Sequence, residues 1–349
     1  MTGENRAVRA RPPVAPKRFD VVCVGNALMD HLAFAPSAVV ESLGLPLGAM
    51  TLVDIATTER IRSVVGQGRQ VSGGAVTNSA VGVASLGGRP AFIGAVATDD
   101  LGDRFTADLE AAGVHAVLQR FVADSAGDEA ATGRCYVIVT PDAERTMATA
   151  LGVGGRLDSA GIDVDVVGDA ELVYFEGYVL DLPEAPALVE RLLDAARGAG
   201  TAVALALSDT LLVERHRGVL EDLTGGPVDI VFGNESELLA LTRREDVPSA
   251  LGAIARPGLT VAVTLGERGA MVGTADGLVD VPACPVDEVV DLTGAGDLFA
   301  AGFCFGVTHG YGPSGAARLG TLAASEVISH LGARPESSLA ELARARGIA

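Results

Sequence analysis

Asp291-Leu-Thr-Gly-Ala-Gly-Asp297 runs directly into the apolar stretch Leu298-Phe-Ala-Ala-Gly-Phe-Cys-Phe305. Glycines at positions 294 and 296 let backbone N–H groups converge at the start of a helix, where the peptide dipoles attract an anion. An acidic residue in a glycine turn at a helix N-terminus gives the same pattern without any ligand. The stretch is not a dinucleotide fingerprint, because the third glycine of that motif would fall at position 299, where this sequence has Phe. It is not a Walker A loop either, because no lysine follows.

The rest of the chain alternates short β-branched runs with amphipathic stretches, beginning at Phe19. The expected strands cover 20–25, 89–94, 201–207, 229–232, 260–264 and 269–273, and the expected helices cover 78–86, 188–198, 235–241, about 296–308 and about 314–330. Such alternation predicts an α/β fold with βαβ units, in which a mostly parallel central sheet carries helices on both faces. Ligands of such sheets bind beyond the carboxyl ends of the strands.

Two segments and the two ends of the chain break this alternation. Residues 31–60 and about 117–150 have the pattern of strands and loops without crossover helices, which predicts a small β-rich lid. Residues 1–18 are basic and proline-containing without the apolar core of a secretory signal, so we expect a disordered tail. The main domain is then expected over 19–340, with a C-terminal tail over 341–349.

The composition narrows the classes of partner. The chain of 349 residues has 45 acidic against 26 basic side chains, a net charge of −19 at neutral pH. This balance argues against nucleic acid or an anionic membrane as the main partner, because both attract clustered Lys and Arg. No apolar run approaches the roughly 18 residues of a membrane span, and no two cysteines form a C-x-x-C pair. We therefore expect a cytoplasmic protein with reduced thiols.

Two further motifs stand near the N-terminal half of the expected sheet. Ser72-Gly-Gly-Ala-Val-Thr-Asn78 opens a helix, and its paired glycines permit close approach of a ligand while Asn78 offers a donor and an acceptor to a polyol. Taken alone, the motif is better explained by a plain loop-to-helix turn. Asp30 follows the first strand and places a carboxylate near the strand tips.

Two motifs in the C-terminal half match the handling of a phosphate. In Asn234-Glu-Ser-Glu237 an amide and a carboxylate three residues apart share one helical face and can hold the waters of a phosphate-bound Mg²⁺; helix capping is the alternative. In Val263-Thr-Leu-Gly-Glu-Arg-Gly269 a strand ends in a hydroxyl and two glycines, which an ordinary β-turn also explains. Lys17 is the only lysine, so any phosphate must be held by backbone amides, arginine or a metal.

Taken together and in this order, the motifs resemble the ribokinase-like (PfkB) carbohydrate and nucleoside kinase family from about residue 19 to residue 340. The segment Gly73-Gly74 to Asn78 is similar to the first family signature, and Asp291–Asp297 is similar to the second. Leu292 stands where the second signature usually has Thr. The resemblance implies a three-layer α/β sandwich with a small β-rich lid, and ATP and Mg²⁺ as cofactors.

The resemblance also implies a role for each matching residue. Asp297 would be the general base, at the anion hole of Gly294, Ala295 and Gly296. The acceptor would be bound by Asp30, Gly73, Gly74 and Asn78, and Arg145 would face a phosphate. Thr264, Gly266 and Gly269 would form the ATP-side turn, and Asn234 and Glu237 would hold Mg²⁺ through water. Because Asp297 stands at a helix N-terminus, we expect its pKa to be lowered.

The acceptor is predicted from weaker similarities. Leu205-Ala-Leu-Ser-Asp-Thr210 resembles the corresponding stretch of adenosine kinases, which favours the 5′-hydroxyl of a ribonucleoside, adenosine first. A sugar kinase of the same family, of fructokinase or ribokinase type, is the alternative. A nicotinamide dehydrogenase would have the same kind of sheet, but this sequence lacks the glycine fingerprint of such an enzyme. A catalytically silent family member, acting as a binding protein, is a further alternative, against which the intact set of Asp297, Asn234 and Glu237 argues. Either a monomer or a homodimer is consistent with the family.

Overall fold

The computed structural model describes residues 16–122, 130–141 and 144–348, so the expected N-terminal tail lies almost entirely outside the described residues. The described chain forms a nine-stranded sheet in the order β14-β13-β12-β11-β10-β9-β1-β5-β6. Its strands are β1 (Phe19–Val24), β5 (Pro90–Ala97), β6 (His115–Phe121), β9 (Ala170–Glu176), β10 (Ala202–Ala206), β11 (Ile230–Asn234), β12 (Thr260–Thr264), β13 (Ala270–Thr274) and β14 (Gly277–Val281). The neighbouring strands from β6 to β12 pair in parallel, whereas β13 and β14 pair antiparallel. The expected mostly parallel sheet is confirmed.

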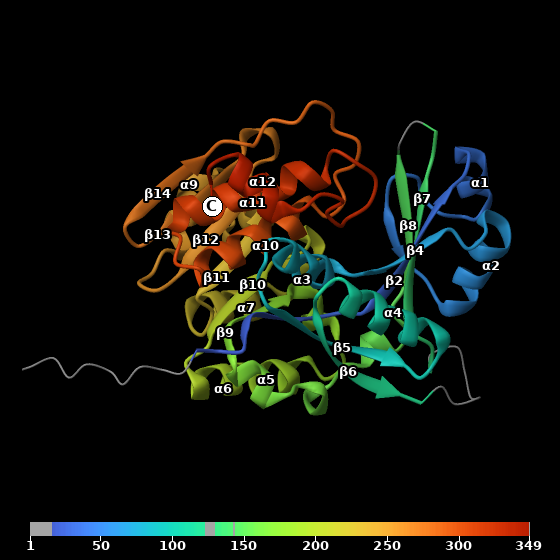
Figure 1. Ribbon diagram of the computed structural model, residues 1–349, viewed down its shortest axis with the longest axis horizontal. Coiled ribbons are helices and arrows are strands. Elements are labelled where there is room, and N and C mark those ends of the chain that lie inside the picture. Colours follow the sequence, from blue (N-terminus) through green and yellow to red (C-terminus); the bar gives the residue numbers. More distant parts are fainter. Residues whose placement is uncertain (1–15, 123–129, 142–143, 349) are drawn as a thin grey trace, which may run out of the picture.

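Helices cover both faces of this sheet, because each central strand is apolar on both sides. One face carries α3 (Ala75–Ser85), α4 (Asp100–Ala111), α10 (Ala295–Thr308), α11 (Pro313–Val327) and α12 (Leu339–Ala345); the other carries α5 (Val164–Gly168), α6 (Ala185–Ala199), α7 (Thr210–Gly225), α8 (Glu235–Thr242) and α9 (Val247–Ile254). Short 3₁₀ turns occupy 152–156, 159–161, 177–181 and 266–268. In Figure 1, α10, α11 and α12 lie in the upper part of the view, and α5 and α6 lie at its lower edge.

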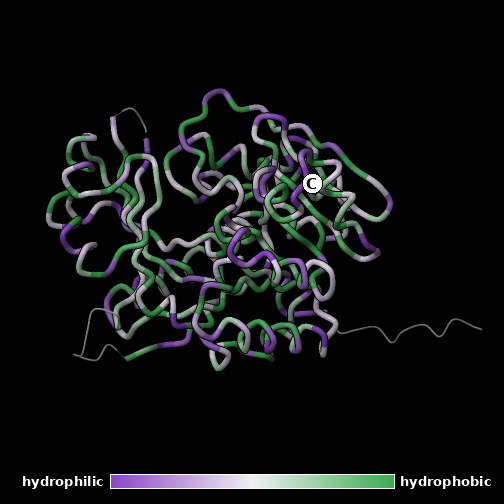
Figure 2. The backbone as a smooth tube through the Cα atoms, turned by 180° about the vertical axis from the view of Figure 1, so that it is seen from behind, coloured by the Kyte–Doolittle hydropathy of each residue, from purple (hydrophilic) through white to green (hydrophobic). Residues whose placement is uncertain are grey.

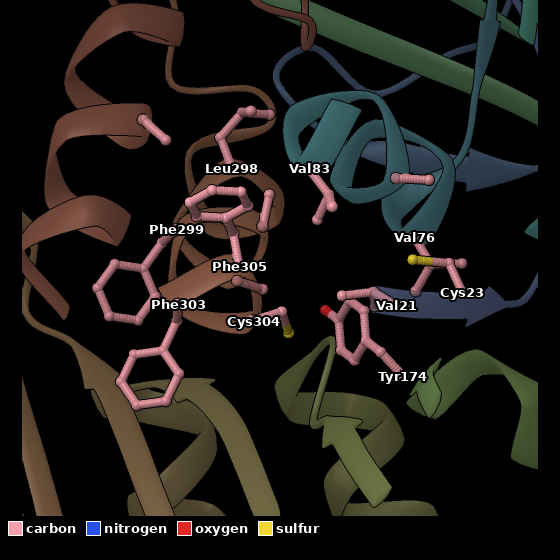
Figure 3. Packing of buried hydrophobic residues seen from close by; sticks show 14 of the residues in the cluster. Val21, Cys23, Val76, Val83, Tyr174, Leu298, Phe299, Phe303, Cys304 and Phe305 are labelled. Carbon is pink, nitrogen blue, oxygen red and sulfur yellow. The ribbon is translucent and has the colours of Figure 1, made fainter. Parts of the chain in front are cut away.

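The core between the sheet and α10 is built from aromatic and β-branched side chains. Phe299 and Phe303 of α10 pack with their ring centroids 6.2 Å apart, and Val21 of β1 and Val83 of α3 belong to the same buried cluster. Figure 3 shows these side chains converging between α10, α3 and β1. This packing fixes the N-terminal ends of α3 and α10 relative to one another.

A second, five-stranded sheet stands beside the first and forms a lid. Its order is β3 (Met50–Leu52), β8 (Arg145–Ala150), β7 (Gly133–Val139), β2 (Leu28–Phe34) and β4 (Arg69–Gly73). Helices α1 (Ser37–Ser42) and α2 (Ile55–Val65) cover its outer face, where Tyr136, Ile138 and Ile61 are buried. Figure 2 shows the lid as a distinct lobe beside the large sheet and its helices.

Three expected boundaries differ from the structure. The segment 31–60 was expected to lack helices but contains α1 and the start of α2, because Val40 and Ile61 supply an apolar side that the lid sheet buries. The lid also extends to β4, whereas 117–121 belong to β6 of the large sheet. The expected C-terminal tail contains most of α12, which is held by the buried side chains of Leu339 and Ala343.

Candidate active site

The lid rises from the edge of the large sheet at which the parallel strands end. β1 leads into β2 of the lid through 25–27, and β9, β11 and β12 end at the same edge in Glu176, Asn234 and Thr264. Parallel strands bring their carboxyl ends together, and ligands of open α/β sheets bind there. The residues predicted from sequence therefore meet at this edge.

Asp297 lies in the first turn of α10 and contacts α3. The Asn78 side-chain amide donates to Asp297 Oδ2 over 2.9 Å, and the Ser79 hydroxyl donates to the Asp297 backbone carbonyl over 2.9 Å. Asn78 is buried, and its Oδ1 has no partner among the described residues. The two family-like signatures are thus joined by a hydrogen bond between a carboxylate and the amide that orients it.

Burial raises the pKa of Asp297 to about 6, although the hydrogen bond from Asn78 lowers it in part. The expectation of a lowered pKa was wrong: loss of solvent around the carboxylate outweighs the favourable field at the helix N-terminus. A carboxylate with this pKa is ionised at neutral pH and is a stronger base than an exposed Asp.

The glycine turn before α10 has a conformation that other residues rarely adopt. Gly294 is the N-cap of α10 with φ of +80°, and a Cβ there would stand 2.8 Å from atoms of Ala333. Glycine at this position therefore lets α10 start at Ala295, whose backbone N–H donates to the carbonyl of Leu292 over 3.3 Å, with Gly296 next in the first turn. The first turn of a helix is where backbone N–H groups can bind an anion, so the turn lies where the sequence predicted an anion hole.

Arg145 reaches this turn from β8 of the lid. Its Nη1 donates to Thr293 Oγ1 over 2.9 Å and forms an ion pair with the buried carboxylate of Asp291. Its Nε and Nη2 are buried and have no partner within the described residues. Asp291 also accepts the backbone N–H of Gly332, so it ties the turn to the loop after α11. Two unpaired guanidinium donors beside an anion-binding turn suit a phosphate.

The acceptor residues predicted from sequence gather around the start of α3. A Cβ at Gly73 would collide with the carboxylate of Asp30, and a Cβ at Gly74 would collide with the carbonyl of Asn26. Gly74 also has φ of +104°, which favours glycine. Burial raises the pKa of Asp30 to about 7, while the charge of Arg334 lowers it and that of Asp297 raises it.

The predicted ATP side lies at the ends of β11 and β12. Asn234 and Thr264 are paired positions of these strands, so they lie side by side. Gly266 and Gly269 both have positive φ, and Gly269 packs against the backbone of 281–283 where no side chain fits. Asn234 and Glu237 form a reciprocal capping box at the start of α8. The capping alternative thus describes their local geometry, and burial raises the pKa of Glu237 to about 7.

Glu176 is a buried carboxylate that the sequence analysis missed. Its Oε1 accepts the backbone N–H of Asn26 over 2.8 Å, and Oε2 accepts that of Val76 over 3.4 Å. It therefore fixes both segments that carry the acceptor residues, and burial raises its pKa to about 7. A carboxylate directly after the apolar run Leu172–Phe175 was the available signal. Asn26 had a similar signal, because it is a polar residue that directly follows the apolar strand β1 and Gly25.

Neither a metal cluster nor a membrane span is found in the described ranges. Among these residues no group of three or more His, Cys, Asp or Glu side chains is arranged to hold a metal ion. No helix of the described chain is long and apolar enough to cross a bilayer.

The raised pKa values predict how stability depends on pH. The carboxyls of Asp30, Glu176, Glu237 and Asp297 have pKa values of about 6 to 7. The folded state therefore binds more protons than the unfolded state. We expect the melting temperature without ligands to fall between about pH 5 and pH 8, with at most about 1.4 kcal/mol per pH unit from each carboxyl. Thermal scans at constant ionic strength measure this slope.

The variant Glu176→Gln provides the control for this slope. It removes one titrating carboxyl while keeping its size, so the decline of melting temperature with pH should become shallower. A melting temperature that stays constant or rises over this interval would contradict the raised pKa values.

With this geometry described, comparison with known proteins decides the family. A family model described as pfkB family carbohydrate kinase matches residues 20–339. The chain belongs to this family. The pfkB fold, with its large mostly parallel sheet flanked by helices, agrees with the structure. The chain is therefore a kinase, a phosphotransferase that acts on an alcohol group.

Relatives within the pfkB family include both nucleoside and sugar kinases. A structure of adenosine kinase from Sinorhizobium meliloti is 41% identical, with a TM-score of 0.86 over 94% of this chain and 99% of that one. A structure of a probable sugar kinase protein from Rhizobium etli CFN 42 is 40% identical, with a TM-score of 0.87 over 95% and 100%. Adenosine kinase of Saccharomyces cerevisiae is 27% identical over 83% of this chain and 89% of the yeast protein.

Proposed function

We propose that this kinase transfers the γ-phosphoryl group of Mg·ATP to the 5′-hydroxyl of a ribonucleoside, with adenosine as the first candidate. The observation that carries the proposal is a set of exposed apolar side chains on the lid face that also carries Asp30. The name of the Sinorhizobium meliloti relative supports the same acceptor. A small-molecule acceptor and a cytoplasmic location belong to this proposal.

The apolar surface follows from the register of the lid strands. Asp30 is level with Cys135 of β7 and Thr149 of β8, and Leu52 of β3 is level with Thr149. Side chains at level positions share one face of a sheet. Leu52 is 61% exposed although it is apolar. A planar base gains free energy by covering such a side chain, whereas a free sugar does not.

The next rows continue the same face. Leu32, Val137 and Met147 occupy the row beside that of Asp30, together with Met50. The row beyond holds Phe34, Val139 and Arg145. The members of this face that are at least partly exposed form what we call the lid platform, which consists of Leu32, Phe34, Met50, Leu52 and Met147, while Val137 and Val139 between them are buried. It joins the ribose-binding carboxylate at one end to the phosphate-facing arginine at the other.

Each residue has a defined part in the transfer. Asp30 accepts hydrogen bonds from two vicinal ribose hydroxyls. The buried Oδ1 atoms of Asn26 and Asn78, which have no partner in the described part of the chain, add acceptors for the ribose. The 5′-oxygen bonds to the γ-phosphorus as the bond to the β,γ-bridging oxygen breaks and ADP leaves. Asp297 takes the hydroxyl proton. The amides of Ala295 and Gly296, with Arg145, stabilise the transferring phosphoryl group.

ATP and Mg²⁺ occupy the other side of the anion hole in this proposal. Thr264, Gly266 and Gly269 line the turn at the nucleotide. Mg²⁺ keeps most of its waters and binds chiefly to phosphates. Asn234 and Glu237, which cap α8, would therefore reach the ion through water. The ion would neutralise charge on the phosphates.

ADP production with Mg·ATP against a panel of acceptors tests the proposal. The panel contains adenosine, inosine, guanosine, cytidine, ribose and fructose. Turnover restricted to nucleosides supports the proposal and identifies the base. Turnover on free ribose or fructose instead would assign the protein to the sugar kinases, the alternative favoured by the name of the Rhizobium etli relative.

The variant Leu52→Gln tests the lid platform. We expect the KM for the nucleoside to rise about tenfold, which corresponds to about 1.4 kcal/mol of lost apolar contact, with the KM for ATP unchanged. Val64→Gln is the matched control, because Val64 is 54% exposed on α2, on the opposite side of the lid. Equal effects of the two substitutions would contradict a base-binding role for Leu52.

A further inference from the structure

Arg334 is a buried arginine that neither the family signatures nor the proposed mechanism uses. It lies in the loop between α11 and α12, and its side chain is only 14% exposed. Its Nη1 donates to Asp108 Oδ2 of α4 over 2.8 Å, and its Nη2 donates to the Ser72 hydroxyl of β4. One guanidinium thus joins the C-terminal loop, a helix of the large domain and the lid.

The backbone N–H and the hydroxyl of Ser72 are both hydrogen-bonded near this guanidinium. Its backbone N–H and its hydroxyl both donate to Asp108 Oδ2, over 2.8 and 2.6 Å. Ser72 is completely buried. The network therefore fixes the last residues of β4 rigidly against α4.

The carboxylate of Asp30 packs against this end of β4. Gly73 follows Ser72, and the carboxylate of Asp30 occupies the space that a side chain at position 73 would fill. Any displacement of Ser72 would therefore move the surface against which the Asp30 carboxylate packs. A change in the contacts of Arg334 would therefore shift the carboxylate of Asp30.

The same guanidinium acts on Asp30 through its charge. The charged and titratable groups around Asp30 are Arg334 from the C-terminal loop, Asp297 from α10 and Cys135 from β7. Burial and Asp297 favour the protonated carboxyl, and Arg334 opposes them. An ionised carboxylate accepts hydrogen bonds from hydroxyls more strongly than a neutral carboxyl.

We propose that Arg334 is a positioning residue for the acceptor: it anchors Ser72, next to the Gly73 against which Asp30 packs, and supplies a positive charge that favours the ionised form of the Asp30 carboxylate. Its role in catalysis rests on the proposed function, since it acts only if Asp30 binds the acceptor. Its effect on Asp30 does not depend on that function and can be measured without any substrate.

The first experiment measures the ionisation of Asp30 directly. A carboxyl ¹³C NMR titration of the free protein, with the Asp30 signal assigned through Asp30→Asn, is compared between wild type, Arg334→Gln and Arg334→Lys. Loss of a nearby positive charge should move the Asp30 midpoint about one pH unit upward in Arg334→Gln, whereas Arg334→Lys should keep it near the wild-type value. An unmoved midpoint in Arg334→Gln would overturn the proposal, whatever the acceptor is.

The second experiment follows the acceptor found by the panel across the pH range. In Arg334→Gln we expect the acceptor KM at pH 7 to rise about tenfold, the acidic limb of kcat/KM to move upward, and the KM for ATP to stay within about twofold. Arg69→Gln is the matched control: it removes a charge from the same strand β4, but its side chain is 70% exposed. A fall in kcat alone with an unchanged acceptor KM and pH profile would mark Arg334 as merely structural.

The two proposals fail in different ways. If Asp30→Asn leaves the acceptor KM unchanged, the proposed function of Asp30 fails, while the NMR midpoint still decides the effect of Arg334 on its ionisation. Because Arg334→Lys keeps the charge, it separates loss of charge from a loss of folding, which melting temperatures of all variants monitor.

Discussion

Asp297→Asn should lower kcat by about 10²- to 10⁴-fold, the usual contribution of a general base, while the affinity for Mg·ATP changes by less than about twofold. Asparagine keeps the size of the side chain and an oxygen that can accept the hydrogen bond from Asn78. It cannot take the proton of the attacking hydroxyl. Steady-state ADP production and calorimetric titration with the nucleotide measure the two quantities separately.

A matched control accompanies this variant. Asp100→Asn also removes a carboxylate from the first turn of a helix, α4, but its side chain is exposed. It should leave kcat unchanged. Full activity of Asp297→Asn would disprove the assignment of Asp297 as the base. Equal losses in both variants would indicate a general effect of charge instead.

Asp30→Ala should raise the acceptor KM by about 10²- to 10⁴-fold. The physical reason is the loss of two hydrogen bonds to a charged group, each contributing about 1.5–3 kcal/mol. The KM for ATP should stay unchanged, because Asp30 lies on the lid strand β2 and the ATP-side turn lies at the end of β12. Steady-state kinetics with the acceptor and ATP varied in turn make the distinction.

Asp30→Asn is the graded form of this experiment. It keeps an oxygen acceptor but loses the charge, so its acceptor KM should lie between those of wild type and Asp30→Ala. An acceptor KM unchanged in both variants would show that Asp30 serves only the packing of the lid against Gly73.

Much of the fold was readable because local patterns and tertiary structure agree. The buried run of β1 ends at Gly25, and α10 starts at the Gly294 turn, so each motif carries its own boundary signal. Once the strands are known to be parallel, their carboxyl ends must lie at one edge, which places Asn234 beside Thr264. The strand ends therefore indicated where the motifs lie, and the family resemblance indicated which of them act together.

What could not be predicted depends on groups distant in the sequence. The raised pKa of Asp297 results from burial under segments such as α3, which stands more than two hundred residues earlier. No local pattern singles out Arg334, because its contacts are with Asp108 and Ser72, which are distant in the sequence. Likewise, α12 forms because tertiary packing buries Leu339 and Ala343. Sequence periodicity predicts the secondary structure of one segment, whereas the pKa values in the site depend on burial and on charges brought together only by folding.

The most direct measurement of the central claim is ³¹P NMR of a reaction of the enzyme with Mg·ATP and adenosine, run beside Asp297→Asn. The account predicts that wild type converts the γ-phosphate signal into ADP and a phosphomonoester coupled to the 5′-methylene protons of the nucleoside, and that the variant leaves both substrates intact over the same time. A phosphomonoester that forms equally in the variant would contradict the account, as would transfer only to water or only to free sugars.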